Sequence, residues 1–277
     1  MTEPDRLVRS SDGTAIAVFE SGAAEPDTLP LVVVHGTTAD HQTFRVVGPL
    51  LARRRRLFAL DRRGRGASGD GPDYDIEREF EDVAAVAEAI ADEADIQVDV
   101  VGHSYGGRCA LGAALRTTSI RRVVCYEGAP APEGLSYQVP GLADRLRAHL
   151  ARDGREAMLE TFMREAIGFD DEAMARFRAD PIWPARVAAA PTILRELEAE
   201  DAPAASLEAL GQVRRPVLQV LGTASLPVFG AATLALDERL ANGSITRIDG
   251  AAHAAHHTHP EAFVAAVEAF LDDPSPS

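Results

Sequence analysis

Short apolar runs that end at or near a glycine recur along the 277-residue chain, and they constrain its fold more than any other feature. Valine, isoleucine and leucine dominate most of them, which is the pattern of strands buried on both faces of a parallel sheet. Six such runs predict six strands: "PLVVVHG" (30–36), "RLFALDRRG" (56–64), "VDVVGHS" (98–104), "IRRVVCYEG" (120–128), "PVLQVLGT" (216–223) and "GSITRIDG" (243–250).

The segments between these runs indicate how the sheet is wound. Residues 75–94 carry apolar side chains at helical spacing with acidic residues outside, and residues 105–116 and 260–271 also predict helices. Residues 7–21 alternate around an Asp-Gly pair, which predicts two antiparallel edge strands. We therefore expect a doubly wound α/β fold with a mostly parallel, eight-stranded sheet.

One region breaks the alternation of strands and helices. Residues 132–212 show helical periodicity and several prolines but no convincing strand. Because this region is inserted after the sixth predicted strand, we expect it to form a helical lid over the ends of the strands. The predicted core then consists of residues 1–131 and 213–277.

Charge and composition argue against several classes of function. A formal net charge of −15 makes nucleic acids and anionic membranes poor partners. No apolar stretch approaches the roughly 20 residues that span a bilayer, and the first residues carry charges where a signal peptide needs an apolar run. Cys109 and Cys125 fall in apolar segments, so we expect buried, reduced thiols. These features predict a cytoplasmic protein.

A serine in the middle of the chain has the setting of a catalytic nucleophile. Ser104 lies in the motif Gly102-x-Ser104-x-Gly106, directly after an apolar run and directly before a helical one. In this context the serine sits on a sharp strand-to-helix turn, which projects its Oγ outward. The start of the following helix supplies backbone N–H groups that stabilise negative charge.

Together these motifs resemble those of the α/β-hydrolase fold superfamily, and specifically its lid-bearing serine hydrolases. The matching segments extend over nearly the whole chain: "HGTTADHQTF" (35–44), "DRRGRGASG" (61–69), "GHSYGG" (102–107) and "GAAHAAHHTHPEAF" (250–263). The resemblance implies an oxyanion hole formed by the backbone N–H groups of Thr37 and Tyr105, with Thr38 as the adjacent alternative. Each such donor is worth roughly 3 kcal/mol. The resemblance also implies the chain order nucleophile, acid, histidine.

Four histidines lie close together near the end of the chain, in "AHAAHHTHP" (252–260). Such a cluster could hold a zinc ion, but no carboxylate ligand stands in register and a proline interrupts the helical spacing. The resemblance instead implies that His253, between the last strand and the last helix, is the general base, a role that imidazole suits at neutral pH. His256, His257 and His259 are then neighbours that tolerate replacement, with His256 as a further pocket residue.

The third member of a catalytic triad is the acid that orients the histidine. Most relatives place an aspartate a few residues after the seventh strand, where this chain has Ser225, and no acidic residue follows until Asp237. Some relatives, including a branch of the haloalkane dehalogenases, carry the acid at the end of the sixth strand instead. Glu127 occupies that position, so we predict that Glu127 is the acid; the alternative is a carboxylate that only caps a turn.

These residues predict a serine hydrolase that cleaves a small carboxylic ester, thioester or lactone through an acyl-enzyme. Two alternatives keep the same fold: a non-hydrolytic acyltransferase, lyase or cofactor-free oxygenase, and a ligand-binding protein that has lost catalysis. We expect a small-molecule substrate, a monomer or homodimer, and neither a metal nor a cofactor. The expected pocket residues are Thr38, His41, Tyr137, Trp183 and His256.

Overall fold

The centre of the protein is a single eight-stranded sheet. The computed structural model describes residues 3–25 and 28–274, and its strand order is β1-β2-β4-β3-β5-β6-β7-β8. The strands are β1 (Arg6–Arg9), β2 (Ala15–Ser21), β3 (Leu31–Val34), β4 (Leu57–Leu60), β5 (Val98–His103), β6 (Ile120–Tyr126), β7 (Val217–Gly222) and β8 (Gly243–Ile248). β2 pairs antiparallel with β1 and β4, and the other neighbouring strands are parallel. The predicted sheet and its edge hairpin are therefore confirmed.

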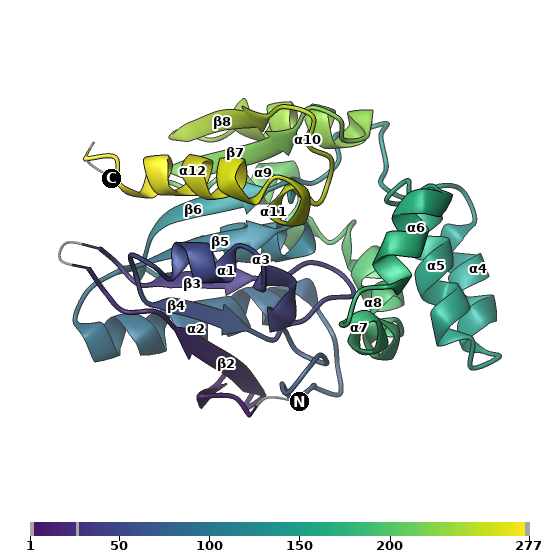
Figure 1. The fold of residues 1–277 in the computed structure, drawn as a ribbon, viewed down its shortest axis with the longest axis horizontal. Coiled ribbons are helices and arrows are strands. Elements are labelled where there is room, and N and C mark those ends of the chain that lie inside the picture. Colours follow the sequence, from purple (N-terminus) through teal and green to yellow (C-terminus); the bar gives the residue numbers. More distant parts are fainter. Residues whose placement is uncertain (1–2, 26–27, 275–277) are drawn as a thin grey trace.

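Helices cover both faces of the sheet (Figure 1). One face packs against α2 (Ile76–Ala94), α3 (Tyr105–Ala114) and α10 (Pro227–Asp237) in one apolar cluster. The other face packs against α1 (Gly48–Leu51) and α12 (Pro260–Leu271) in a second cluster. Every residue of β3 and β7 is buried, which is why their sequences are almost uninterrupted apolar runs.

The helices predicted from periodicity are present at nearly the predicted residues. Asp75 caps α2, because its side chain accepts a hydrogen bond from the Glu77 N–H at 2.9 Å. α12 begins at Pro260, a first helical position where the missing N–H of proline costs no hydrogen bond. Local sequence signals therefore mark where both of these helices begin.

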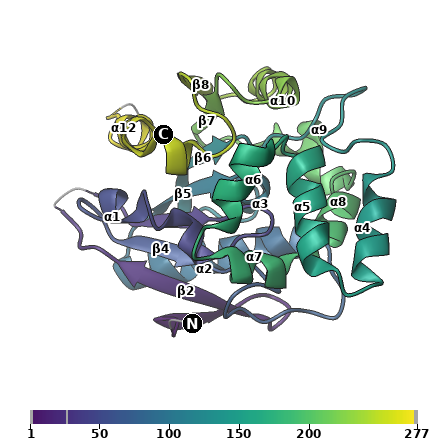
Figure 2. The ribbon, with the colours of Figure 1, turned by 45° about the vertical axis from the view of Figure 1, so that its right-hand side comes forward.

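Between β6 and β7 the described chain forms helices and no strand. The five longer helices lie together at one end of the sheet (Figures 1 and 2) and share an apolar cluster of their own. They are α4 (Leu142–Leu150), α5 (Arg155–Glu165), α6 (Asp171–Arg178), α7 (Trp183–Ala189) and α8 (Thr192–Ala199). The two short elements that follow, η2 (Pro203–Ala205) and α9 (Leu207–Leu210), pack instead into the main core beside α2 and α3.

A buried cluster of charges fastens these helices to the core. Glu196 of α8 accepts hydrogen bonds from Arg62, at 2.5 Å, and from Arg65, both in the loop after β4. Arg62 also makes a two-point contact with Glu79 of α2, at 2.9 and 2.6 Å. Although burial raises the pKa of Glu79, the charges of Arg62 and Arg65 hold it at about 2. The arginine- and glycine-rich segment 61–69 is therefore a structural connection.

Both cysteines are buried and form no disulfide, as predicted. Burial raises the pKa of the Cys125 thiol to about 12 and that of Cys109 further, so neither is a thiolate near neutral pH. No helix within the described ranges has both the length and the apolar composition that crossing a bilayer requires.

Candidate active site

Ser104 stands at the turn between β5 and α3 in a backbone conformation that few side chains adopt. Its φ is 55° and its ψ is −126°, a combination that costs on the order of 1–3 kcal/mol and persists only where the surrounding fold imposes it. Its N–H donates to the Tyr126 carbonyl at 2.7 Å, which ties the turn to the end of β6. Its Oγ forms no hydrogen bond within the described part of the chain and faces a cavity.

Two glycines allow the strand, the turn and the helix to approach one another this closely. A Cβ on Gly102 would lie 2.3 Å from the carbonyl oxygen of Gly106. A Cβ on Gly106 would lie 2.3 Å from the carbonyl oxygen of His35, in the loop after β3. Because both obstacles are backbone atoms, no side chain fits at either position. The glycines of the motif therefore hold Ser104 beside the loop after β3.

The structure brings Glu127 and His253 together. Glu127 directly follows β6, and His253 lies between β8 and the short helix α11 (Ala255–Thr258). The Nδ1 of His253 lies 2.6 Å from Oε2 of Glu127, whose side chain is completely buried. An ionised carboxylate accepts the proton on Nδ1, so Nε2 becomes the nitrogen that can accept a proton. His253 and Ser104 line the same cavity, with no hydrogen bond between them in the described chain.

Ser225, at the position where an acid was expected from the resemblance, forms a hydrogen bond with the Glu127 carboxylate. Its Oγ donates to Oε1 of Glu127 at 2.6 Å, and the Gly222 N–H donates to the same oxygen at 2.8 Å. Together with the His253 contact, these bonds offset the cost of burying the charge. Glu127 has a positive φ of 47°, a second strained position at the end of a strand. Glu127 thus approaches His253 from the end of β6, and its other hydrogen-bond donors come from the last residue of β7 and the loop that follows it.

The two predicted oxyanion donors, Thr37 and Tyr105, both lie beside Ser104. They line a small cavity of about 40 Å³ together with Ser104 and Glu127. Tyr105 is the first residue of α3, a position whose N–H has no acceptor inside the helix. The Thr37 N–H donates to no acceptor within the described ranges. Both amides are therefore available to negative charge that develops next to Ser104.

A larger cavity of about 480 Å³ opens over Ser104, a size typical of pockets for small ligands. One side of it consists of loops that follow the strands, among them Thr38, Ser104 and His253. The other side consists of the helices between β6 and β7, among them Phe162, Phe177 and Arg186. The helical segment therefore lies over the strand ends that carry Ser104 and His253.

Three further histidines line this larger cavity: His103, His256 and His257. The ring centroids of His103 and His253 are 4.7 Å apart, and the pairs His103–His256 and His256–His257 are each 4.3 Å apart. Burial lowers the pKa of His103 and of His256 well below the usual value, and neighbouring positive charges add to this effect. Burial also lowers the pKa of His257, to about 4. The three rings are therefore neutral near pH 7.

Three of the five predicted pocket residues face the cavities. Thr38 and His256 line the larger cavity and Tyr137 lines the smaller one. The structure places Trp183 elsewhere, which corrects the prediction. Its ring packs edge-on against Phe177, with the centroids 5.6 Å apart, in the apolar cluster of the helical segment. The physical reason is that five short helices need a core of their own, and the large apolar side chains supply it.

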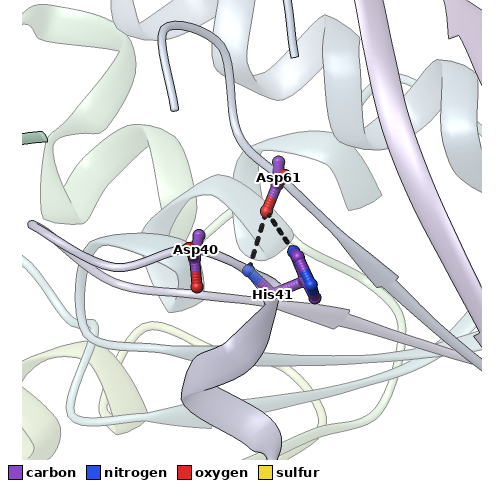
Figure 3. A group of neighbouring side chains, drawn as sticks. All are labelled: Asp40, His41 and Asp61. Atoms are coloured by element: carbon purple, nitrogen blue, oxygen red, sulfur yellow. Dashed lines mark hydrogen bonds and ion pairs between the residues drawn. The ribbon is translucent and has the colours of Figure 1, made fainter. Parts of the chain in front are cut away.

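His41 is also placed away from both cavities, held by Asp61 (Figure 3). Its backbone N–H and its Nδ1 each lie 2.8 Å from Oδ1 of Asp61, and its ring stacks on Phe19. With Asp40, these two residues form the group of described side chains whose ligand atoms are close enough for a cation, within 4.8 Å of one another. The second oxygen of Asp61 accepts a hydrogen bond from the Ala67 N–H, so both oxygens of this carboxylate already have donors. The cluster therefore connects the loop after β3 with the loop after β4.

Several cavity residues are absent from the sequence prediction. The Nε2 of His103 lies 2.8 Å from the carbonyl oxygen of His253, and Phe229 stacks on the His253 ring with the centroids 4.4 Å apart. Arg186 reaches the cavity from α7. The position of His103 next to Ser104 could have revealed it. Phe229 and Arg186 lie in segments whose place over the site depends on tertiary packing.

Residues 31–266 match the sequence model of the alpha/beta hydrolase family. Because this match covers most of the chain, the protein belongs to the alpha/beta hydrolase family. The resemblance implied by the nucleophile motif is thereby confirmed, together with the fold.

Similar proteins include both esterases and other members of this family. The chain is 29% identical over 272 residues to the non-heme chloroperoxidase of Streptomyces lividans, covering 92% of this chain and 95% of that one. It is 27% identical over 264 residues to the pimeloyl-[acyl-carrier protein] methyl ester esterase of Neisseria meningitidis serogroup A, covering 90% and 80%. Among solved structures, an alpha/beta hydrolase from Sphaerobacter thermophilus superposes with a TM-score of 0.79 at 28% identity, covering 96% and 99%.

Proposed function

We propose that this protein is a serine hydrolase that cleaves a small carboxylic ester, thioester or lactone through an acyl-enzyme. Ser104 is the nucleophile, His253 the base and Glu127 the acid. The observation that carries the proposal is the buried 2.6 Å contact between Glu127 and His253 at the cavity that Ser104 also lines. Burying a carboxylate is costly, so its place beside a histidine and a strained serine favours a catalytic role.

Each group has a defined part in the reaction. The Nε2 of His253 accepts the hydroxyl proton of Ser104 as Oγ attacks the carbonyl carbon of the substrate. The N–H groups of Thr37 and Tyr105 hold the oxyanion that forms. His253 then gives the proton to the departing alcohol, thiol or ring oxygen, and an acyl-enzyme remains. A water molecule that gives a proton to His253 attacks the acyl carbon, and the acid product leaves as Ser104 regains its proton.

The relatives favour an ester bond as the target. The Neisseria protein is named a methyl ester esterase, and its similarity extends over 90% of this chain. The non-hydrolytic alternatives use the same three residues and differ in what enters the cavity. In an acyltransferase, an added alcohol or amine captures the acyl group in preference to water, so product analysis with such an acceptor separates the two activities.

The proposal is tested with p-nitrophenyl esters of increasing acyl length, from acetate to octanoate. We expect the wild-type protein to release p-nitrophenol from at least the shorter esters, at least about 10³-fold faster than the uncatalysed reaction. The acyl group should appear as free acid in water and in the presence of added methanol at low concentration. Release no faster than the buffer for the entire series would contradict the proposal.

A further inference from the structure

Arg186 is a buried arginine that has no ion-pair partner among the described residues. It lies on α7, is only 8% exposed and lines the same 480 Å³ cavity as Ser104. Its side chain forms no ion pair with any described carboxylate, and its buried Nε has no hydrogen-bond partner. Its contact with an aromatic ring is a stack, with the guanidinium carbon 4.6 Å from the centre of Phe177. Buried arginines normally pair with an anion, so this one calls for an explanation.

The two carboxylates that act on the charge of Arg186 are hydrogen-bonded or ion-paired to other groups. Asp180 forms an ion pair with Arg45, and its Oδ1 accepts the Ile182 N–H at 3.0 Å. Asp40 accepts the backbone N–H of Gln42 at 2.9 Å and the side-chain amide of the same residue at 3.2 Å. Although these two acids favour the charged form of Arg186, burial lowers its pKa to about 10. The guanidinium therefore stays charged at neutral pH, with no ion pair to a carboxylate in the described part of the chain.

Two histidines that also line this cavity have unpaired ring nitrogens among the described residues. The Nδ1 of His256 and the Nε2 of His257 are buried and have no hydrogen-bond partner among the described residues. Both rings line the cavity, and the charge of Arg186 contributes to lowering the pKa of each. The rings are thus neutral and close enough to the guanidinium to feel its charge. Each offers a nitrogen that can donate a proton to an acceptor or take one from a donor.

We infer that Arg186, with His256 and His257, binds a carboxylate group of the substrate, so that the substrate is an ester, thioester or lactone that also carries an acid group. A guanidinium matches a carboxylate with two parallel hydrogen bonds, and a buried site strengthens them. The other charged groups at the cavity are less suited. Arg176 is paired with Glu172 at the surface, and Asp170 caps α6. This inference deepens the proposed function and rests on it.

The test compares each half-ester with its neutral diester. Monomethyl succinate, glutarate and adipate carry one carboxylate at increasing distance from the ester, and the dimethyl esters of the same acids carry none. At the best length, we expect the wild-type protein to prefer the half-ester in kcat/KM by about tenfold or more. Arg186→Gln should lower kcat/KM for that half-ester by about 10- to 100-fold and for the diester by less than about threefold.

Two further variants separate charge recognition from packing. Arg176→Gln removes the exposed, paired arginine of the same cavity and should leave the preference for the half-ester unchanged. Arg186→Lys keeps a positive charge and should retain part of the preference for the half-ester, although a lysine cannot form the two-point contact. An equal loss for half-ester and diester in Arg186→Gln would overturn the inference, as would a wild-type protein without any preference for half-esters.

Binding of a dicarboxylate gives a second measurement that does not depend on hydrolysis. Glutarate should raise the melting temperature of wild-type protein and of Ser104→Ala, but not that of Arg186→Gln. If no ester is hydrolysed yet glutarate binds through Arg186, the proposed reaction fails and the anion site stands. If esters are hydrolysed and glutarate raises the melting temperature of Arg186→Gln as much as that of the wild type, the anion site fails and the hydrolase stands.

Discussion

Replacing Ser104 by alanine is expected to lower kcat for p-nitrophenyl butyrate by about 10⁴- to 10⁶-fold, because no other group can form the acyl-enzyme. The Oγ makes no hydrogen bond in the described chain, and alanine keeps the Cβ that packs near Gly36. The variant should therefore melt within a few degrees of the wild type. The measurement is steady-state kinetics on protein whose fold is checked by circular dichroism.

The matched control for this variant is Ser225→Ala, which removes a nearby hydroxyl that contacts Glu127 but not the substrate carbonyl. We expect this change to lower kcat by at most about tenfold, the order of one lost hydrogen bond to the acid. Turnover by Ser104→Ala within tenfold of the wild type would show that the nucleophile is another group.

Glu127→Gln is expected to lower kcat by about 10³- to 10⁴-fold with little change in the fold. Glu127 Oε1 accepts hydrogen bonds from both Gly222 and Ser225, so the oxygen of the new amide should keep that side. The amide NH₂ then faces Nδ1 of His253 and donates a hydrogen bond to it. The imidazole must therefore carry its own proton on Nε2 instead of Nδ1. That tautomer cannot take the proton of Ser104. Activity within threefold of the wild type would contradict the assignment of the acid.

A carboxylate placed on the neighbouring strand should recover part of this loss. Ser225 Oγ is 2.6 Å from the Glu127 carboxylate, at the place where most relatives carry their acid. In the double variant Glu127→Gln with Ser225→Asp, we expect kcat to rise about tenfold or more above Glu127→Gln alone. Ser225→Asp in the wild-type background brings two carboxylates together and should instead reduce activity, because like charges at this distance cannot both ionise freely.

Much of the fold could be predicted from local sequence patterns. The apolar runs around Val33 and Val220 are buried on both faces of the sheet, and only a central strand needs such a sequence. A Cβ at Gly102 or Gly106 would lie 2.3 Å from a backbone oxygen, so both positions require glycine. The motif therefore predicts the tight turn at Ser104. The approach of Glu127 to His253 was also predictable, because parallel strands end at one edge of the sheet and their loops meet there.

The roles of the helical residues could not be predicted in the same way. Trp183 and Arg186 lie three positions apart on the same side of α7 and both pack against Phe177, yet only Arg186 is among the residues that line the larger cavity. Helical periodicity separates the buried side of α7 from its exposed side, but it does not tell which residue on the buried side reaches the cavity. His41 was misplaced for a related reason: its orientation is set by Asp61, which lies 20 residues further along the chain.

The proposed reaction requires that Ser104 form a covalent acyl-enzyme, and a fluorophosphonate probe can test this requirement without a known substrate. The probe reacts with an activated serine, and mass spectrometry of the intact protein and of its peptides locates the adduct. We expect one adduct per chain, on the peptide that contains Ser104, and none on Ser104→Ala. A folded wild-type protein that stays unlabelled would contradict this expectation and would favour a ligand-binding protein that has lost catalysis. An adduct on another residue would also contradict it and would show that the nucleophile is another group.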